Sequence, residues 1–291
     1  MLTLKEVSLR KGKRTYLDEV SFTAETGRIT AIVGTRSAGR TELVRIIMGL
    51  IAADEGTIEL EDFELDFGDR QNFGYLPAER GGYPNMRVLD QIVYLARLHG
   101  ITLGAAERNA LTLLGHLELA DRGYAPLKNL SGAEIARVDI AATLAADPDV
   151  VVIDDAFAGL DAASLRLVTS LLRAHASSGV PVILATDDWE AAQTFADDVV
   201  ILGQGKVTAK GSVEKLLGDP HYRVETTDTE AAASALKSRT GISDVKTAGR
   251  ERVSFRANDA RSAAAAVAEL KNVKNFESVR PTLAEQYKEA L

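Results

Sequence analysis

The sequence has no cysteine and no long apolar run, and each absence excludes a class of protein or site. With 0 cysteines in 291 residues, the chain cannot form disulfide bridges, thiolate metal sites or a cysteine nucleophile, a composition typical of proteins in reducing compartments. Apolar runs such as residues 150–153 are far shorter than the ~18 residues that a membrane-spanning helix needs. Any membrane role must therefore come through a partner.

The amino terminus and the charge balance exclude two further classes. Residues 1–9 alternate like a strand and lack the basic stretch and apolar core of a signal peptide, so we expect no secretion. The 34 lysines and arginines are outnumbered by 42 aspartates and glutamates, which gives a net charge of −8. A protein that binds nucleic-acid phosphates has the opposite balance. We therefore expect a cytoplasmic protein with no nucleic-acid partner.

The length predicts two domains, since about 150 residues per domain is typical. Residues 1–218 alternate strand-like and helix-like segments, which indicates an α/β layered domain. A mostly helical insert occupies about residues 88–144. The composition changes near Gly218 to Pro220, and residues 222–291 combine alanine-rich helices with short strands. This second part predicts a small C-terminal α+β domain.

Apolar periodicity predicts the individual elements. In the first domain we expect a helix at residues 40–50 and strands at residues 2–9, 20–24, 28–33, 150–153, 181–186 and 199–202. In the second domain we expect helices at residues 230–237 and 261–270, and strands at residues 222–225, 253–256 and 275–279.

A glycine-rich turn lies between a predicted buried strand and a predicted helix. Its spacing, with Gly34, Gly39 and Thr41, is that of a phosphate-binding loop in which Arg40 stands where lysine is usual. Glycines let backbone N–H groups surround phosphate oxygens, and the helix N-terminus adds partial positive charge. The alternative is a strand-to-helix turn without a ligand. The candidate phosphate-binding residues are Gly34, Ser37, Ala38, Gly39, Arg40, Thr41 and Glu42.

Further segments follow this loop in a recognisable order. They are Leu-Ser-Gly-Ala-Glu at residues 130–134 before a helix, a strand at residues 150–154 that ends in aspartate, and Ala-Gly-Leu-Asp at residues 158–161. The order resembles that of the ATP-binding subunits of ABC transporters, in which a Walker A loop, an LSGGQ signature, a Walker B strand and a D-loop follow one another.

The resemblance covers roughly residues 1–218. Residues 73–80 look like the Q-loop of that family, and residues 184–188 look like its histidine-switch strand. The tail at residues 280–287 is similar to the C-terminal extension of a sodium- and drug-efflux-type subgroup. The resemblance implies an α/β fold: an ABC-type P-loop ATPase domain with a helical insert, followed by the small C-terminal α+β domain.

The same resemblance implies cofactors, partners and residue roles. The cofactors are ATP and Mg²⁺, with Thr41 and Asp154 at the metal. Ser131, Gly132 and Glu134 form the signature, which in the family meets the ATP bound to the opposite subunit. The implied partners are a transmembrane transporter subunit and a second ATP-binding subunit, and the implied location is peripheral, on the cytoplasmic face of the membrane. A capped helix start, with Ser131 and Glu134 in a capping box, is an alternative that is compatible with the signature role.

Several positions depart from the family's pattern. Lys11 stands where an aromatic ring stacks on adenine, with Tyr16 nearby, and Arg40 replaces the lysine that reaches the terminal phosphates. Glu42 replaces a second hydroxyl near the α-phosphate; alternatively, it complements the helix dipole. Ala78 occupies the position of the polar Q-loop residue that senses the metal and the attacking water.

Two candidate catalytic positions are also altered. Asp155 replaces the glutamate that orients the attacking water, and so retracts the carboxylate by one methylene. Asp187 stands where a histidine would contact the γ-phosphate, and an anion there repels phosphate. We therefore expect a degenerate ATP-binding subunit that hydrolyses ATP weakly or not at all by itself and supplies its signature to a more complete partner in a heterodimer. The alternatives are a non-nucleotide structural or regulatory subunit and an active homodimeric transport ATPase.

The segment at residues 73–99 is the expected contact with the membrane partner. In the family the Q-loop and the helical insert form the groove for that partner. Here Tyr75, Tyr83, Pro84 and Met86 supply the aromatic and flexible apolar side chains that are typical of interface cores. Packing of the insert against itself is the alternative.

Overall fold

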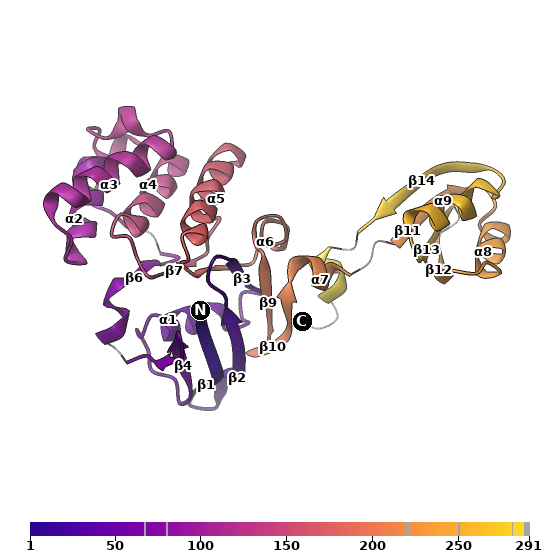
Figure 1. Cartoon of the computed structure of the whole chain (residues 1–291), viewed down its shortest axis with the longest axis horizontal. Helices are drawn as coiled ribbons and strands as arrows, with labels where there is room; N and C mark the ends of the chain where they lie inside the picture. The colour runs from indigo at the N-terminus through magenta and orange to yellow at the C-terminus, as the bar shows by residue number, and fades with distance from the viewer. Residues whose placement is uncertain (67, 80, 219–220, 250, 281, 288–291) are drawn as a thin grey trace. The chain divides into compact units, whose positions relative to one another are not determined.

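The computed structural model describes residues 1–66, 68–79, 81–218, 221–249, 251–280 and 282–287 (Figure 1). Arg80 of the Q-loop-like segment, residues 219–220 at the expected domain boundary, Pro281 in the tail and residues 288–291 lie outside the described residues. The described residues fall into two compact units, residues 1–213 and residues 214–287. In the described ranges, no helix has the length and apolar character needed to cross a membrane.

The first unit is built on a six-stranded sheet with the order β10-β9-β3-β8-β7-β6. All neighbouring strands are parallel except β10, which is antiparallel to β9. Every residue of β3, β7 and β8 is buried, as expected for a parallel sheet covered on both faces. The strands are β3 (Ile29–Gly34), β6 (Phe73–Leu76), β7 (Val150–Asp154), β8 (Val182–Thr186), β9 (Asp198–Gly203) and β10 (Lys206–Ser212).

A second, antiparallel sheet in this unit has the order β2-β1-β4-β5. Its strands are β1 (Leu2–Lys11), β2 (Arg14–Ala24), β4 (Glu55–Leu60) and β5 (Phe63–Glu64). Leu4 and Phe22 of this sheet share one hydrophobic core with Ile32 of the parallel sheet and with Ile47 of helix α1 (Arg40–Ile47). The two sheets therefore hold α1, and the loop before it, between them.

A helical region interrupts the chain between β6 and β7, two neighbouring strands of the parallel sheet. Its long helices are α2 (Val88–Leu98), α3 (Leu103–His116) and α4 (Gly132–Leu144), which pack on one another (Figure 1). The α/β fold class with a helical insert is thus confirmed. The remaining helices of the first unit are η1 (Gly68–Asn72), η2 (Ala120–Arg122), η3 (Leu127–Asn129), α5 (Ala162–Ser177) and α6 (Trp189–Phe195).

The second unit holds an antiparallel sheet with the order β12-β13-β11-β14. Side chains of β11 and β13, such as Val224 and Phe255, pack against the apolar faces of α8 and α9. This β-α-β-β-α-β arrangement is that of ferredoxin-like domains. The elements are α7 (Val213–Leu217), β11 (His221–Thr226), α8 (Thr229–Lys237), β12 (Ile242–Ala248), β13 (Arg252–Ala257), α9 (Ala260–Ala268), β14 (Val273–Val279) and α10 (Leu283–Tyr287).

Several predicted boundaries are corrected. The helix predicted for residues 40–50 ends at Ile47, because Met48 is its C-cap and Gly49 has a φ of 69°, in the left-handed region that ends helices. Strands β4 and β12 were not predicted. In β12 the alternation is interrupted at Asp244, which has a φ of 52° and lies at a register shift relative to β13.

Candidate functional site

The glycine-rich loop, residues 35–39, connects β3 to α1. A Cβ added to Gly34 would lie 2.5 Å from the carbonyl oxygen of Leu202, and one added to Gly39 would lie 2.5 Å from that of Tyr16. Gly39 also has a φ of 95°, which side chains disfavour. Both glycines of the motif are therefore required by the close approach of β2 and β9 to the loop.

Helix α1 begins at this loop without a side-chain cap. Its N-cap residue, Gly39, provides no side-chain hydrogen bond, so the first-turn N–H groups depend on other partners. Within the loop, the Ala38 N–H donates to the carbonyl oxygen of Thr35 at 3.0 Å, while Ser37 is exposed. Glu42 lies in the first turn, where a carboxylate complements the helix dipole.

Arg40 and Asp187 face each other at the start of α1. The Nη2 atom of Arg40 lies 3.6 Å from Oδ2 of Asp187, and Nε of Arg36 lies 3.7 Å from the same oxygen. The two arginines differ in exposure, since the side chain of Arg40 is 12% exposed and that of Arg36 is 94% exposed. One carboxylate oxygen therefore interacts with a buried and an exposed guanidinium at once.

The turn after β8 explains why Asp187, and not Asp188, faces the arginines. Asp188 is the N-cap of α6, and its side chain accepts a hydrogen bond from the Ala191 N–H at 2.9 Å. The Asp188 N–H in turn donates to the hydroxyl of Thr186 at 3.0 Å. Because Asp188 is engaged in capping, the charge offered to the phosphate-binding loop comes from Asp187.

Burial and the nearby carboxylates shift the pKa of Arg40 in opposite directions. Burial lowers the pKa of the Arg40 guanidinium below its ordinary value, while the negative charges of Asp187, Asp154 and Asp155 oppose that effect. The Nε atom of Arg40 is buried and has no hydrogen-bond partner among the described residues. The site thus contains a largely buried cation whose pKa is affected by three carboxylates and whose Nε atom is an unpartnered donor.

Thr41 and Asp154 form the candidate metal site. Asp154 ends β7 and is 4% exposed; burial raises the pKa of its carboxyl group, and a hydrogen bond with Thr41 opposes this shift. Its Oδ2 atom is buried without a hydrogen-bond partner among the described residues. Mg²⁺ in nucleotide sites is typically held by one or two protein oxygens together with phosphates and water. Thr41 and Asp154 fit that requirement.

In the part of the chain that the structure describes, no group of three or more histidine, cysteine, aspartate or glutamate side chains is placed to hold a metal ion. A divalent cation at Thr41 and Asp154 would take other ligands from phosphates and water, as Mg²⁺ usually does in nucleotide sites.

Asp155 and Ala78 are the two remaining positions for which the sequence predicts a departure from the family's pattern. Asp155 directly follows β7 with a φ of 53°, and its carbonyl oxygen accepts a hydrogen bond from the Ala158 N–H at 3.1 Å. Ala78 is exposed on the segment after β6 and offers only a methyl group. Neither a metal nor a water molecule can be bound by that side chain.

Tyr16 lies beside the loop and is covered by two cations. The Cζ atom of Arg14 lies 4.5 Å, and the Nζ atom of Lys11 5.4 Å, from the centroid of the Tyr16 ring. Both distances are within the range of cation–π interactions. Lys11, at the expected adenine position, is thus held against an aromatic ring that the chain itself supplies.

The signature residues form a separate group at the start of α4. The Ser131 hydroxyl accepts a hydrogen bond from the Glu134 N–H at 3.3 Å, and the Glu134 carboxylate accepts one from the Ser131 N–H at 2.8 Å. This is the predicted capping box. The bond from Ser131 holds the pKa of Glu134 below its ordinary value, and Arg122 donates to the same carboxylate at 3.0 Å.

Gly132 faces open space. A Cβ added there would meet no described atom within 4 Å, and Gly132 does not have a positive φ. Packing and backbone strain in this chain therefore do not require a glycine at that position. The nearby Gly159 of the D-loop-like segment has a φ of 77°, and its added Cβ would lie 4.0 Å from the Gly132 carbonyl oxygen.

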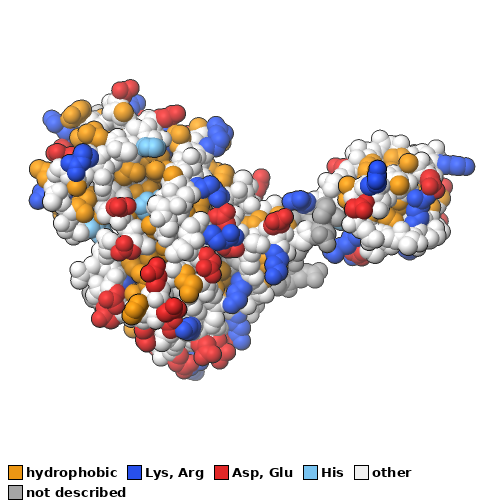
Figure 2. Space-filling model, viewed as in Figure 1, with side chains coloured by type: hydrophobic (Ala, Val, Ile, Leu, Met, Phe, Trp, Pro, Cys, Tyr) orange, Lys and Arg blue, Asp and Glu red, His pale blue; other side chains and the backbone are white. Residues whose placement is uncertain are grey.

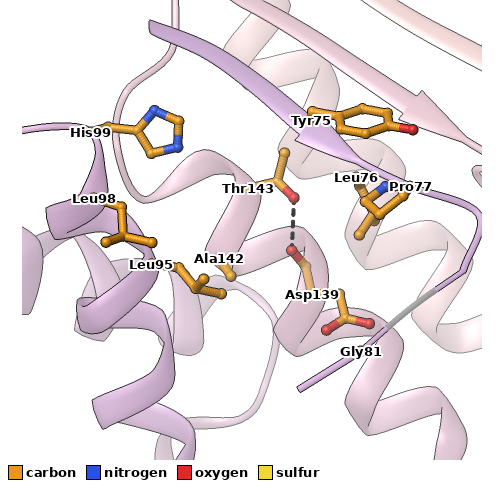
Figure 3. A pocket seen from close by; sticks show the side chains of 10 residues that line it. All are labelled: Tyr75, Leu76, Pro77, Gly81, Leu95, Leu98, His99, Asp139, Ala142 and Thr143. Atoms are coloured by element: carbon orange, nitrogen blue, oxygen red, sulfur yellow. Dashed lines mark hydrogen bonds between the residues drawn. The ribbon is translucent and has the colours of Figure 1, made fainter. Parts of the chain in front are cut away.

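A pocket of about 250 Å³ lies where β6, α2 and α4 meet (Figure 3). In Figure 3, His99 and the leucines of α2 lie on one side, and the residues at the end of β6 lie on the other. The Thr143 hydroxyl donates to the carbonyl oxygen of Asp139 at 2.9 Å along the α4 wall. The lining residues are Tyr75, Leu76, Pro77, Gly81, Leu95, Leu98, His99, Asp139, Ala142 and Thr143.

Two exposed aromatic side chains lie close in the chain to residues that line this pocket, Tyr83 before α2 and Tyr94 on α2. Tyr83 and Tyr94 are 53% and 42% exposed, and their rings meet edge to face with centroids 5.9 Å apart. The Tyr83 N–H donates to Oε1 of the buried Gln91 at 2.8 Å, which fixes the segment on α2. Hydrophobic side chains also gather over the helical region on the face seen in Figure 2.

The structure brings most of the predicted Walker-side residues together. The charges of Asp154, Asp155 and Asp187 raise the pKa of Arg40, and a hydrogen bond joins Thr41 to Asp154. The prediction missed Arg36, which lies inside the loop motif at a position where the motif allows any residue. Its role becomes visible only when the fold places Asp187 beside it.

Comparisons with known proteins identify the family to which a site of this kind belongs. The family model described as ABC transporter matches residues 17–158. A methionine import ATP-binding protein of Rhodococcus jostii is 31% identical over 235 residues, which cover 76% of this chain and 69% of that protein. An uncharacterized ABC transporter ATP-binding protein of Bacillus subtilis is 26% identical over 242 residues, with 83% and 81% coverage.

The fold comparison gives the same answer. A structure titled as the ATP-binding subunit of an ABC transporter matches with a TM-score of 0.67 and 25% identity, and the match covers 74% of this chain and 91% of that one. A relative above 30% identity, matched over more than two thirds of its length, and the fold of the first unit point to one family. The chain belongs to the ATP-binding proteins of ABC transporters.

Proposed function

We propose that this chain is a degenerate ATP-binding subunit that contributes its signature, and not a hydrolysing Walker site, to an ABC transporter. The observation that carries the proposal is the ion pair between Arg40 and Asp187 at the phosphate-binding loop. A carboxylate at that point opposes the negative charge that a hydrolysable terminal phosphate would add. The signature at α4 also holds a carboxylate, that of Glu134, but this carboxylate is paired with Arg122 at 3.0 Å.

The replacements on the Walker side affect each step of hydrolysis. Lys11 and Arg40 alter the contacts to base and phosphate, Ala78 removes the polar Q-loop group, and Asp155 retracts the carboxylate that would orient water. A positioned general base contributes roughly 10²- to 10⁴-fold to a rate. A site with all these changes can bind nucleotide but hydrolyses it poorly, because each change lowers the rate even though the separate losses do not simply add.

The signature side retains what a phosphate contact requires. Ser131 and Gly132 are exposed at the N-terminus of the 13-residue helix α4. Helix N-termini attract anions, and the open space at Gly132 allows close approach of another molecule. These features support a role in which this chain completes a nucleotide site on a second ATP-binding subunit.

Nucleotide and metal in this chain's own site would be held by a reduced set of groups. Backbone N–H groups of residues 35–37 and 39 and the guanidinium of Arg40 would contact phosphate, while Thr41 and Asp154 would contact Mg²⁺. The cation supplies charge neutralisation for the phosphates. The free donor of Arg40 and the unpaired oxygen of Asp154 support this assignment.

The transmembrane partner would dock at the pocket in Figure 3. Gly81 and the leucines of α2 line this pocket, and the exposed rings of Tyr83 and Tyr94, close to them in the chain, suit an interface, since aromatic residues are enriched in interfaces and supply large buried area. Docking at this surface would place the chain peripherally, on the cytoplasmic face of the membrane.

ATP turnover by the purified chain tests the proposal. We expect the chain alone to show no ATPase activity above a control preparation of Asp154→Asn, and activity to appear only when a second ATP-binding subunit and the membrane subunit are present. Hydrolysis by the chain alone at a rate that Asp154→Asn abolishes would instead establish the active homodimer.

A further inference from the structure

Asp187, in the turn after β8, places a negative charge beside Arg40, the cation that would contact the outer phosphates of a nucleotide at the phosphate-binding loop. We propose that Asp187 makes this site selective for nucleoside diphosphates over triphosphates. The inference rests on the proposed function in one respect, namely that the Walker side of this chain still binds nucleotide. It adds which nucleotide that site prefers and which residue sets the preference.

Asp187 lies beside both guanidinium groups at the loop. Its Oδ2 atom lies 3.7 Å from Nε of Arg36 and 3.6 Å from Nη2 of Arg40, the residue at the motif position that contacts the outer phosphates in loops of this kind. Asp188 cannot replace it, because Asp188 caps α6. The negative charge beside the loop is thus fixed by two neighbouring elements, α1 and the turn after β8.

The ion pair nevertheless leaves room for a phosphate. Both N–O distances are longer than a hydrogen bond, so Asp187 neutralises the arginines without using up their donors. The Nε atom of Arg40 has no partner among the described residues, and Gly39 does not cap α1 through a side chain. A diphosphate can therefore take these donors while Asp187 remains in place.

A triphosphate brings additional charge to the same place. Its terminal group would approach a region that already holds Asp187 together with Asp154 and Asp155, all of which act on Arg40. The side chain of Asp187 is 44% exposed, so water screens the repulsion between two like charges about 4 Å apart there, and we expect it to lower affinity by about tenfold. A triphosphate must displace Asp187 from Arg40 or accept this repulsion, whereas a diphosphate brings less negative charge to the same place.

Equilibrium binding of ADP and ATP to the full-length chain, with and without Mg²⁺, tests the inference. We expect wild type to bind ADP about tenfold or more tightly than ATP. Asp187→Asn should tighten ATP binding by about tenfold and change ADP binding by less than about threefold. Glu190→Gln is the matched control, since it removes one negative charge from α6, three residues further along; its ADP-to-ATP ratio should equal that of wild type.

Phosphate chains without a nucleoside separate the phosphate effect from base recognition. Pyrophosphate should compete with labelled ADP, and tripolyphosphate should compete less well with wild type but equally well with Asp187→Asn. Thermal unfolding checks that the variant is folded; if it is not, the wild-type ADP-to-ATP ratio and the competition by the two polyphosphates decide.

Three results would overturn the inference. They are equal affinities of wild type for ADP and ATP, an unchanged ratio in folded Asp187→Asn, and no binding of either nucleotide to wild type. The last result would leave the signature role of Ser131 intact, because that role is measured by ATPase activity of the assembled transporter. Failure of the inference and failure of the proposed function are therefore distinguishable.

Discussion

Oδ2 of Asp187 lies 3.6 Å from Nη2 of the largely buried Arg40, at the start of α1. The pair joins two connections at the same edge of the parallel sheet, the phosphate-binding loop after β3 and the turn after β8. The resemblance to the family implies a lysine and a histidine at these two positions; here an arginine and an aspartate stand there and form an ion pair. Substitution of one residue of the pair at a time tests the consequences of this ion pair.

Removal of Arg40 should destabilise the protein more than removal of Arg36. Both contact Oδ2 of Asp187, but Arg40 is 12% exposed and also opposes the charge of Asp154, whereas Arg36 is 94% exposed. Arg40→Ala leaves carboxylates without a counter-charge in a partly buried site, so we expect a loss of about 1–3 kcal/mol. Arg36→Ala, the matched control, should cost about 0.5 kcal/mol or less. Unfolding in urea measures both, and equal losses would show that burial of Arg40 is irrelevant.

The capping box at α4 predicts a pH-dependent stability. The hydrogen bond from the Ser131 N–H holds the pKa of Glu134 below its ordinary value, so the ionised carboxylate stabilises the folded state. That contribution is complete above the ordinary glutamate pKa of about 4.3 and is lost as the pH falls through the lower, folded value.

Wild type and Glu134→Gln should therefore differ by a constant free energy of unfolding between about pH 7 and pH 5, and by less at lower pH. Urea unfolding at a series of pH values checks this, with Glu107→Gln on the exposed side of α3 as the control for loss of one charge. A difference that grows toward acid pH would mean that the folded protein raises the pKa of Glu134 instead of lowering it.

Cysteine crosslinking should capture the transmembrane subunit from the segment beside the pocket. The chain has no natural cysteine, so Tyr83→Cys or Asn85→Cys introduces a unique thiol at an exposed position. Asp62→Cys, in the exposed turn between β4 and β5, is the control. We expect crosslinks from residues 83 and 85 in the assembled transporter and none from residue 62. Equal capture from all three positions would remove the support for this docking surface.

Truncation after Gly218 should leave the first unit folded. The strands of the second unit hydrogen-bond to one another, and its hydrophobic core is separate from that of the first. We expect the shortened chain to unfold cooperatively, with a midpoint within about 4 °C of the corresponding full-length transition. An insoluble product, or loss of the cooperative transition, would show that residues 1–218 do not form an independent domain.

The elements that can be predicted from the sequence are those whose pattern is local. Buried strands such as β3 and β7 are mostly apolar, and the loop before α1 has a fixed glycine spacing, so both can be recognised without a structure. The capping box at Ser131 is visible for the same reason. In contrast, β12 was missed because a left-handed residue, Asp244, shifts its alternation.

The chemistry of the site depends on contacts that no local pattern encodes. Asp187 is recognisable in the sequence as an unusual residue, but its pairing with Arg36 and Arg40 follows only from the parallel alignment of β3 with β8. The cations over Tyr16 depend likewise on the turn that brings Lys11 and Arg14 back onto the ring. Such pairings join residues far apart in sequence or across a hairpin, and periodicity carries no information about them.

The central claim is that this chain contributes its signature, and not its Walker side, to ATP hydrolysis. The ATPase rate of the assembled transporter with two single variants of this chain tests it most directly. Ser131→Arg places a bulky cation at the start of α4, and Asp155→Asn removes the retracted carboxylate but keeps a side chain that tolerates the φ of 53°. We predict that Ser131→Arg reduces the rate by about 10²-fold or more and that Asp155→Asn leaves it within about twofold of wild type. Loss of activity in Asp155→Asn, with activity retained in Ser131→Arg, would contradict the account.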